Sequence, residues 1–139
     1  MKLVIQSWQE ARDLATRVRH AVFVEEQYVP IELELDSIDS RAWHALAYLN
    51  GVCVGTARLF TENDRCHIGR MAVLATYRRQ GLGSALLSTL VQYAQAHHMG
   101  SIYLNAQVAV IPFYAKFHFI SEGAIFNDAG ILHQTMRLN

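Results

Sequence analysis

Segment 78–85, RRQGLGSA, constrains the fold of this 139-residue chain more than any other stretch. It joins an apolar segment, MAVLATY, to residues 82–98, where Leu82, Leu86 and Leu90 recur at helical spacing. A strand-like segment, SIYLN, follows this helix. Because a helical crossover connects the two strands, they are predicted to run parallel in one sheet.

The chain before this unit predicts a strand, a helix and a meander. KLVIQS is a short strand, and Ser7 with Glu10 forms the capping-box pattern that begins a helix, predicted to run from Trp8 to Phe23. WHALAYLNGVCVGTARLF is predicted as a hairpin about its Asn-Gly pair, since both residues of a type I′ turn need positive φ. CHIGRMAV then returns as a third antiparallel strand.

The last part of the chain predicts a short helix, AVIPFYAKFH, with Pro112 in its first turn, and a closing strand, HQTMRL. The order β-α-β-β-β-α-β-α-β predicts an α+β fold, a mixed and mostly antiparallel sheet with helices on both faces. The length suits a single domain over residues 1–139. Residues 24–40 are predicted as a long loop with a short helical turn that forms the rim of a functional site.

Composition excludes several classes of partner. Lysine plus arginine and aspartate plus glutamate number 12 each, so no overall positive charge exists to hold nucleic acid. No apolar run approaches the roughly 18 residues of a membrane helix, and the first residues lack a secretory-signal pattern, so a soluble cytoplasmic protein is expected. Strands predicted to pair about Asn63 place Cys66 opposite Phe60 and Cys53 opposite Val73, and no disulfide is expected.

The glycines of segment 78–85 indicate an anion site at a helix N-terminus. Gly81 and Gly83 allow a tight turn and the close approach of a ligand, while the first N–H groups of the helix are unpaired and carry the positive end of its dipole. Arg78 and Arg79 add formal charge. A plain glycine-rich turn with two solvated arginines is the alternative for this stretch alone. The third glycine of a dinucleotide fingerprint and the lysine of a P-loop are missing.

The surroundings of this loop resemble a known family. Arg78-x-x-Gly81-x-Gly83 after GRMAV, together with LNAQVAVIPFYAKFHF and the order of the elements, resembles the GNAT superfamily of acetyl-coenzyme A dependent N-acetyltransferases. The resemblance covers nearly the whole chain. The front segment, VRHAVFVEEQYVPIELELDSID, is similar to that of a small bacterial subgroup. Many relatives are dimers, so the resemblance makes a homodimer one expectation.

The resemblance implies acetyl-coenzyme A as the donor and assigns its binding residues. Backbone N–H groups of the loop would hold the pyrophosphate, and main-chain groups of Met71 and Val73 would pair with the pantetheine arm in a slot where this strand splays from SIYLN. Asn105 and Tyr114 match the positions that line the thioester. The implied cofactor-binding residues are Met71, Ala72, Val73, Arg78, Arg79, Gln80, Gly81, Leu82, Gly83, Ser84, Ala85, Asn105 and Tyr114.

The resemblance also implies two catalytic groups. Tyr114 is predicted as the general acid that protonates the departing thiolate, with a place in the aromatic core of PFYAKFHF as the alternative. His133 in AGILHQTM is predicted as the general base, because some relatives place a histidine in a similar context, and His44 is the second candidate. His118 replaces a glycine of the family, so positive φ is expected there. No histidine or cysteine spacing indicates a metal site.

The acceptor is expected opposite the cofactor, between the first helix, residues 24–40 and the last strands. Carboxylates in that segment favour a cationic amine: Glu25, Glu26, Glu32, Glu34, Asp36 and Asp39. Glu26 is the one predicted to bind it. Arginines point instead to an acceptor carboxylate or phosphate: Arg19, Arg41, Arg58 and Arg70. A small amine, an amino acid derivative and a protein amino group therefore all stay open.

Two other functions fit parts of the sequence. A non-catalytic acyl-coenzyme A sensor on the same fold would keep the loop but need neither Tyr114 nor a base. A nucleotide- or phosphate-binding domain would also use the loop, but the sequence lacks the ribose-binding and lysine signatures of such domains.

Overall fold

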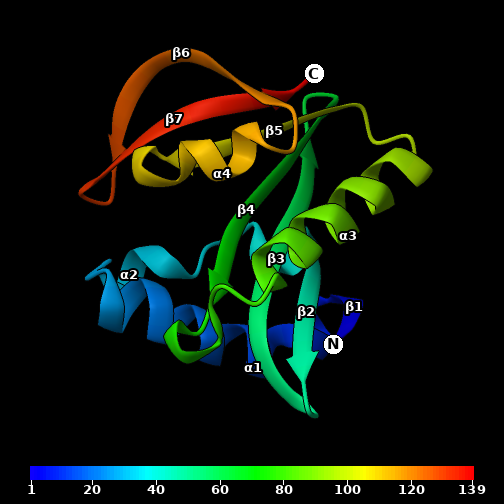
Figure 1. Ribbon diagram of the computed structural model, residues 1–139, viewed down its shortest axis with the longest axis vertical. Coiled ribbons are helices and arrows are strands. Elements are labelled where there is room, and N and C mark those ends of the chain that lie inside the picture. Colours follow the sequence, from blue (N-terminus) through cyan, green and yellow to red (C-terminus); the bar gives the residue numbers. More distant parts are fainter.

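Seven strands form one mixed sheet in the computed structural model, which describes residues 1–139 (Figure 1). In chain order the strands are β1 (Lys2–Ser7), β2 (Trp43–Leu49), β3 (Val52–Glu62), β4 (Arg65–Val73), β5 (Ser101–Gln107), β6 (Phe119–Asp128) and β7 (Ile131–Leu138). Across the sheet their order is β1-β2-β3-β4-β5-β7-β6, with β4 and β5 parallel and all other neighbours antiparallel. The predicted parallel pair and the mostly antiparallel mixed sheet are confirmed.

Four α-helices and a π-helix accompany the sheet. They are α1 (Trp8–Arg19), α2 (Ile31–Glu34), α3 (Leu82–Ala96), α4 (Ile111–Ala115) and the π-helix η1 (His20–Glu26). α1 begins with the predicted capping box, in which the Glu10 N–H donates to Ser7 Oγ and the Glu10 carboxylate accepts from the Ser7 N–H. None of the helices is long and apolar enough to cross a membrane.

The segment between α1 and β2 differs from the prediction. α1 ends at Arg19 rather than Phe23, because the chain continues from there as η1. The long loop with a short helical turn predicted over residues 24–40 is confirmed in part: α2 is such a turn, but the segment also contains the end of η1 and a 3-10 turn at Asp39–Arg41. Its short helices carry too few apolar residues to show a helical repeat in the sequence.

Helices cover both faces of the sheet, and side-chain alternation along β2 shows how. Ala45 and Ala47 point to one face, where they share a core with Leu86 of α3. Leu46 points to the opposite face and shares a second core with Ala15 of α1. Because successive side chains of a strand point to opposite faces, one strand contributes to both cores. The predicted sandwich with helices on both faces is confirmed.

Two-residue turns connect the first three antiparallel strands after α1. Asn50 and Gly51, between β2 and β3, both have positive φ, as predicted. The β3–β4 turn also has two residues of positive φ, Asn63 and Asp64, which shifts the register predicted for a turn about Asn63 alone. The observed pairs are Cys66 with Thr61 and Val73 with Gly55, in place of the predicted Phe60 and Cys53. Both cysteines are buried and free.

β6 is the one strand that the sequence did not predict. It forms an edge of the sheet, and nearly all of its side chains are exposed, so it lacks the alternation of apolar and polar residues that marks a strand. Gly123 has positive φ at a break in its pairing with β7. Just before β6, His118 has a φ of 71°, which confirms the positive φ expected at this position.

The parallel strands β4 and β5 pair over only four residues each, from Arg65 with Ser101 to Ile68 with Leu104. Beyond this point β4 bends at a bulge, where Arg70 has a φ of 46°. β5 continues beside β7 instead, and in Figure 1 this part of the sheet turns away from the first four strands. The predicted splaying of the two strands is therefore confirmed.

Candidate active site

A cavity of about 950 Å³ lies where β4 and β5 diverge. Most of the residues predicted for the site line it: Met71, Ala72, Val73, Arg78, Arg79, Gly81, Leu82, Gly83, Ser84, Asn105, Tyr114 and His133. Three predicted residues do not line it: Glu26, Gln80 and Ala85. The fold thus brings together predicted residues that lie as far apart in the chain as Met71 and His133.

The glycine loop, residues 78–85, presents a row of unpartnered backbone donors. Arg79 and Gly81 have φ of 64° and 83°, and Gly81 precedes α3 without a side-chain cap. The N–H groups of residues 79–84 make no hydrogen bond, whereas the Ala85 N–H donates to the Gly81 carbonyl at 3.0 Å. Ala85 is therefore the one predicted donor that the helix already uses. The other six N–H groups lie at the positive end of a 15-residue helix, which suits an anion.

The Arg78 side chain binds protein groups and closes one edge of the loop. Its Nη1 and Nη2 donate to the two carboxylate oxygens of Glu26 at 2.6 and 2.7 Å, and its Nε donates to the Val73 carbonyl at 2.9 Å. These bonds from Arg78 lower the pKa of the Glu26 carboxyl. Glu26, predicted to bind the acceptor, is instead a partner of Arg78 outside the cavity lining.

Tyr114 has the environment of a neutral phenol. Burial raises its pKa to about 12, and its hydroxyl has one polar neighbour, Met71 Sδ at 3.9 Å. The ring packs edge-on against Phe113 and Phe119 while the residue lines the cavity. Both predicted places for Tyr114, in an aromatic cluster and at the site, are thus occupied by one side chain. Near neutral pH the phenol keeps its proton and can donate it.

His133 and Asn105 lie on adjacent strands at the other side of the cavity. The Asn105 side-chain oxygen accepts from Thr135 Oγ1 at 2.8 Å. His133 Nδ1 lies 2.7 Å from the Ile131 carbonyl, which can only accept, so Nδ1 carries the proton in the neutral ring. Nε2 then holds a lone pair, as a general base requires. The imidazole is stacked on Phe126.

Of the remaining histidines, His44 is excluded as the general base, and His67 is a residue of the cavity that the sequence did not single out. His44 is buried, its Nε2 lies 2.9 Å from the Asp39 carbonyl, and it does not line the cavity, so its prediction as an alternative base is wrong. His67 lines the cavity, is stacked on Phe60, and makes no hydrogen bond; burial lowers its pKa. The sequence held one signal for this position. His67 lies between Cys66 and Ile68, which belong to the core under α3, and alternation along the strand therefore places His67 on the opposite face.

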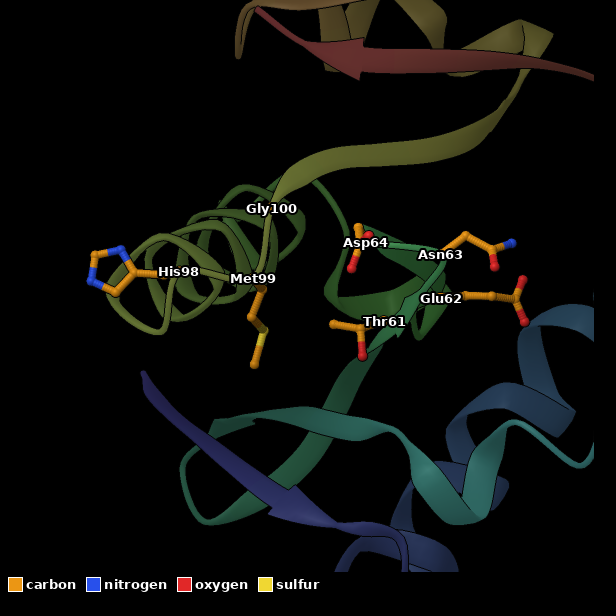
Figure 2. A pocket seen from close by; sticks show the side chains of 7 residues that line it. All are labelled: Thr61, Glu62, Asn63, Asp64, His98, Met99 and Gly100. Atoms are coloured by element: carbon orange, nitrogen blue, oxygen red, sulfur yellow. The ribbon is translucent and has the colours of Figure 1, made fainter.

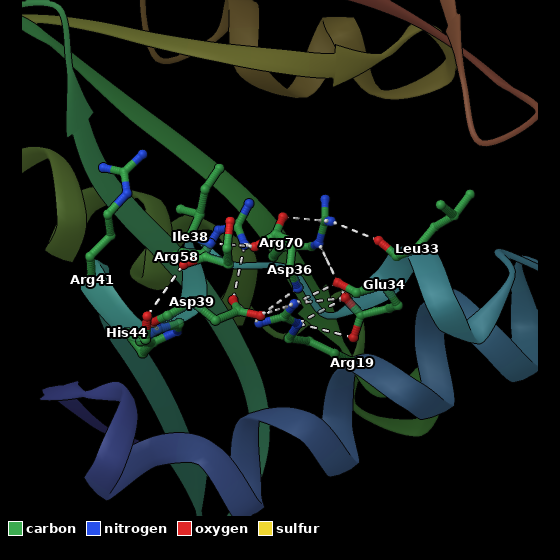
Figure 3. Close-up of polar contacts among 12 residues, drawn as sticks. Arg19, Leu33, Glu34, Asp36, Ile38, Asp39, Arg41, His44, Arg58 and Arg70 are labelled. Carbon is green, nitrogen blue, oxygen red and sulfur yellow. Dashed lines mark hydrogen bonds and ion pairs between the residues drawn. The ribbon is translucent and has the colours of Figure 1, made fainter.

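Three of the carboxylates expected to attract a cationic amine, Glu34, Asp36 and Asp39, are bound by arginines instead (Figure 3). Six ion pairs form a closed ring in which each charge contacts two of opposite sign, in the order Arg19, Glu34, Arg70, Asp36, Arg58, Asp39 and back to Arg19. Arg19, Glu34 and Asp39 are almost fully buried. The prediction of an acidic rim is therefore wrong here, because arginines distant in sequence neutralise it.

A second hollow, of about 480 Å³, lies between the β3–β4 turn and the end of α3 (Figure 2). Its lining contains none of the predicted site residues and a single hydrophobic side chain, Met99. In Figure 2 the side chains of His98 and Glu62 point away from each other rather than toward a common point. This arrangement offers no set of converging polar groups.

Comparison with known proteins agrees with the fold. Residues 6–119 match the acetyltransferase (GNAT) family. The chain belongs to this family. The GNAT protein is 35% identical over 138 residues to the uncharacterized N-acetyltransferase YjcF of Bacillus subtilis, with 98% of each chain covered. It is 30% identical over 122 residues to Protein ElaA of Escherichia coli, covering 84% of this chain and 80% of that protein.

Solved structures show the same architecture as the GNAT protein. The crystal structure of Escherichia coli ElaA superposes with a TM-score of 0.90 at 26% identity, covering 100% of both chains. An acyl-CoA N-acyltransferase from Pseudomonas aeruginosa superposes with a TM-score of 0.90 at 24% identity over 99% of both chains, and this likeness concerns the fold. GNAT proteins move an acyl group from acyl-coenzyme A to an amine, so membership supports N-acyltransferase activity.

Proposed function

We propose that this GNAT protein transfers the acetyl group of acetyl-coenzyme A directly to a primary amine in the cavity between β4 and β5. One observation carries the proposal. Of the six unpartnered N–H groups of residues 79–84, five belong to residues that line the same cavity as the protonated phenol of Tyr114 and the free Nε2 of His133. Acetyl is the favoured acyl group because YjcF, the relative at 35% identity, carries the name of an N-acetyltransferase.

The donor would bind mainly through backbone groups. The pyrophosphate would bind the unpartnered N–H groups of residues 79–84, which lie at the positive end of the α3 dipole. Along β4 the Leu74 N–H donates to the Val54 carbonyl of β3, so the main-chain groups of Met71 and Val73 face the gap on the other edge. The pantetheine amides can pair there like an added strand. One of these groups, the Val73 carbonyl, already accepts a hydrogen bond from Arg78 Nε.

The reaction then needs one base and one acid. His133 Nε2 removes a proton from the acceptor amine, whose nitrogen attacks the thioester carbon. The tetrahedral adduct collapses as the C–S bond breaks, and the Tyr114 hydroxyl donates its proton to the departing thiolate. The products are an N-acetylated amine and coenzyme A thiol. His133 then releases its proton to solvent, and the Tyr114 phenolate takes up a proton from solvent, which restores both groups. His67, which also lines the cavity, is the control for the base assignment.

Release of coenzyme A thiol tests this function. Purified protein is mixed with acetyl-coenzyme A and, in separate reactions, with amino acids, polyamines and short peptides. We expect micromolar affinity for acetyl-coenzyme A and thiol release with at least one class of amine. An affinity weaker than millimolar would remove the donor from the proposal. Tight binding without thiol release from any amine would favour the non-catalytic sensor.

A further inference from the structure

One part of the cavity lies on the side of the sheet that faces α1 and α2. Leu59 and Ile68 belong to the core under α3, so their neighbours Arg58 and His67 point to the opposite face. Arg58 and His67 both line the cavity, together with Arg70 of the β4 bulge. We call this part the α2-side pocket. It lies opposite the face that carries Tyr114 and α3. An acceptor that enters it would meet a donor bound in the gap between β4 and β5.

The ring of ion pairs satisfies its carboxylates but leaves arginine donors over. Arg58 is only 5% exposed, and all of its hydrogen bonds come from Nη1, to Asp36 at 2.8 Å and Asp39 at 2.9 Å. Its Nε is buried without any partner, and its Nη2 makes no hydrogen bond. A guanidinium buried in this way retains unused capacity to bind an anion.

Arg70 adds a second incompletely used guanidinium to the same pocket. Its Nε donates to the carbonyl and carboxylate of Glu34, and its Nη2 to the Leu33 carbonyl and Asp36, while Nη1 makes no hydrogen bond. Burial lowers the pKa of Arg70, and the charges of Arg58 and Arg19 lower it further, with only partial compensation by the carboxylates. The ring holds three arginines and three carboxylates, so what the α2-side pocket offers an anion is unused N–H donors rather than a surplus of positive charge.

We propose that Arg58 and Arg70 bind a carboxylate of the acceptor, so that the acceptor is an amino acid or a similar amine whose carboxylate lies near its amino group. The proposal rests on the N-acyltransferase function above. A planar carboxylate matches the donors of guanidinium groups. A doubly charged phosphate fits less well, because Glu34 and Asp36 line the same pocket. A polyamine would find no free carboxylate in the ring, since each one already contacts two arginines.

The remaining lining of the α2-side pocket indicates the rest of such an acceptor. Phe23, Leu33, Ile38 and Phe60 supply apolar surface. They favour an amino acid with an apolar side chain over a charged one. With its carboxylate held on this side, the amino group of the acceptor is directed to the gap between β4 and β5.

Matched acceptors test the proposal on the unaltered protein. Phenylalanine, phenylalaninamide and phenethylamine share one apolar group, but only the first has a carboxylate. We expect phenylalanine, or leucine in the equivalent series, to give a kcat/KM at least about 100-fold above its amide and its decarboxylated amine, as loss of a charged contact in a polar site would produce. Equal or better use of the amides would overturn the carboxylate site and leave the proposed function intact.

Binding measurements separate the two proposals. Calorimetric titration of the complex with coenzyme A by each member of the series reports on the pocket without turnover. Preferential binding of the acid without any thiol release would support the carboxylate site and overturn the proposed function. Equal binding of acid and amide would overturn the site.

A conservative variant tests the arginine assignment. Arg70→Lys keeps the charge but loses the free Nη1 donor, so KM for the acid should rise about 10-fold while KM for the amide and the affinity for acetyl-coenzyme A stay unchanged. The matched control is Arg41→Lys, an exposed arginine that pairs with Glu62 and does not line the cavity. An unchanged KM for the acid in Arg70→Lys would contradict the assignment.

Discussion

The two ends of the cavity are built on opposite principles. The glycine loop is one continuous stretch whose unpartnered donors are the backbone N–H groups of residues 79–84. The ring of ion pairs at the α2-side pocket needs side chains from α1, α2, β3, β4 and the segment between α2 and β2, with partners up to 36 residues apart. A backbone site depends little on which side chains surround it, whereas a side-chain ring fails when one member is lost.

Breaking the ring should produce the largest effect. Arg19 is 1% exposed and contacts Glu34 and Asp39, which are themselves buried. Arg19→Ala leaves buried carboxylates with fewer partners and should lower the free energy of unfolding by about 3–5 kcal/mol. Urea unfolding followed by circular dichroism measures it. Arg41→Ala, which removes an exposed pair, is the control and should cost less than about 1 kcal/mol. Equal midpoints for the two variants would refute the structural role of the ring.

Filling the loop should abolish donor binding without unfolding the protein. Gly83 lies in the first turn of α3, and a Cβ there would be 3.6 Å from Phe113, an ordinary contact. The indole of Gly83→Trp would occupy the cavity, so the affinity for acetyl-coenzyme A should fall at least about 1,000-fold, roughly 4 kcal/mol. Ser84→Ala keeps the N–H group and should bind normally. Calorimetry decides, and a large loss of affinity in Ser84→Ala would show that side chains carry the binding.

Removing the phenol should affect turnover more than binding. Tyr114→Phe keeps the aromatic packing but deletes the proton donor, so kcat should fall about 100-fold while KM for acetyl-coenzyme A changes little. Because the pKa of Tyr114 is raised to about 12, its proton stays in place and kcat should show no decline from this group below about pH 11. A kcat equal to that of the unaltered protein would assign proton donation elsewhere.

Replacing each of the two histidines that line the cavity tests which one is the general base. His133→Gln should lower kcat near neutral pH about 100-fold, whereas His67→Gln should change it less than about 3-fold. The pH dependence of kcat/KM in the two variants is the measurement. The reverse pattern would move the base to His67, on the face of the sheet away from α3.

The smallest effect is expected at the Glu26–Arg78 pair. Both side chains are partly exposed, so Glu26→Gln should change the free energy of unfolding by less than about 1 kcal/mol. Acceptor KM should stay the same, because Glu26 does not line the cavity. A strong increase in acceptor KM would restore the role that the sequence predicted for Glu26.

The sequence predicted the parts of the molecule that depend on local patterns. The spacing of Leu82, Leu86 and Leu90 predicted α3, and the glycines before it predicted a tight turn followed by unpaired N–H groups. The Asn50-Gly51 pair predicted a hairpin with positive φ at both residues. Each of these features is fixed by a few neighbouring residues, and so each is readable without the tertiary structure.

Features that depend on distant partners were not readable. The carboxylates between α1 and β2 formed an acidic cluster in the sequence, and only the fold brings Arg58 and Arg70 to them. β6 escaped notice because an exposed edge strand needs no apolar alternation. Alternation along β4 gives the face that His67 occupies, but its place in the cavity lining also depends on where β5 departs, which no local pattern records.

The central claim is that backbone N–H groups of the glycine loop bind a phosphate of the donor. Titration with S-acetyl-4′-phosphopantetheine and with S-acetylpantetheine tests it most directly, because the two differ by a single phosphate that would lie at the loop. The phosphate should strengthen binding at least about 30-fold, as charge-assisted hydrogen bonds to several N–H groups require. Equal affinities for the two compounds would contradict the claim.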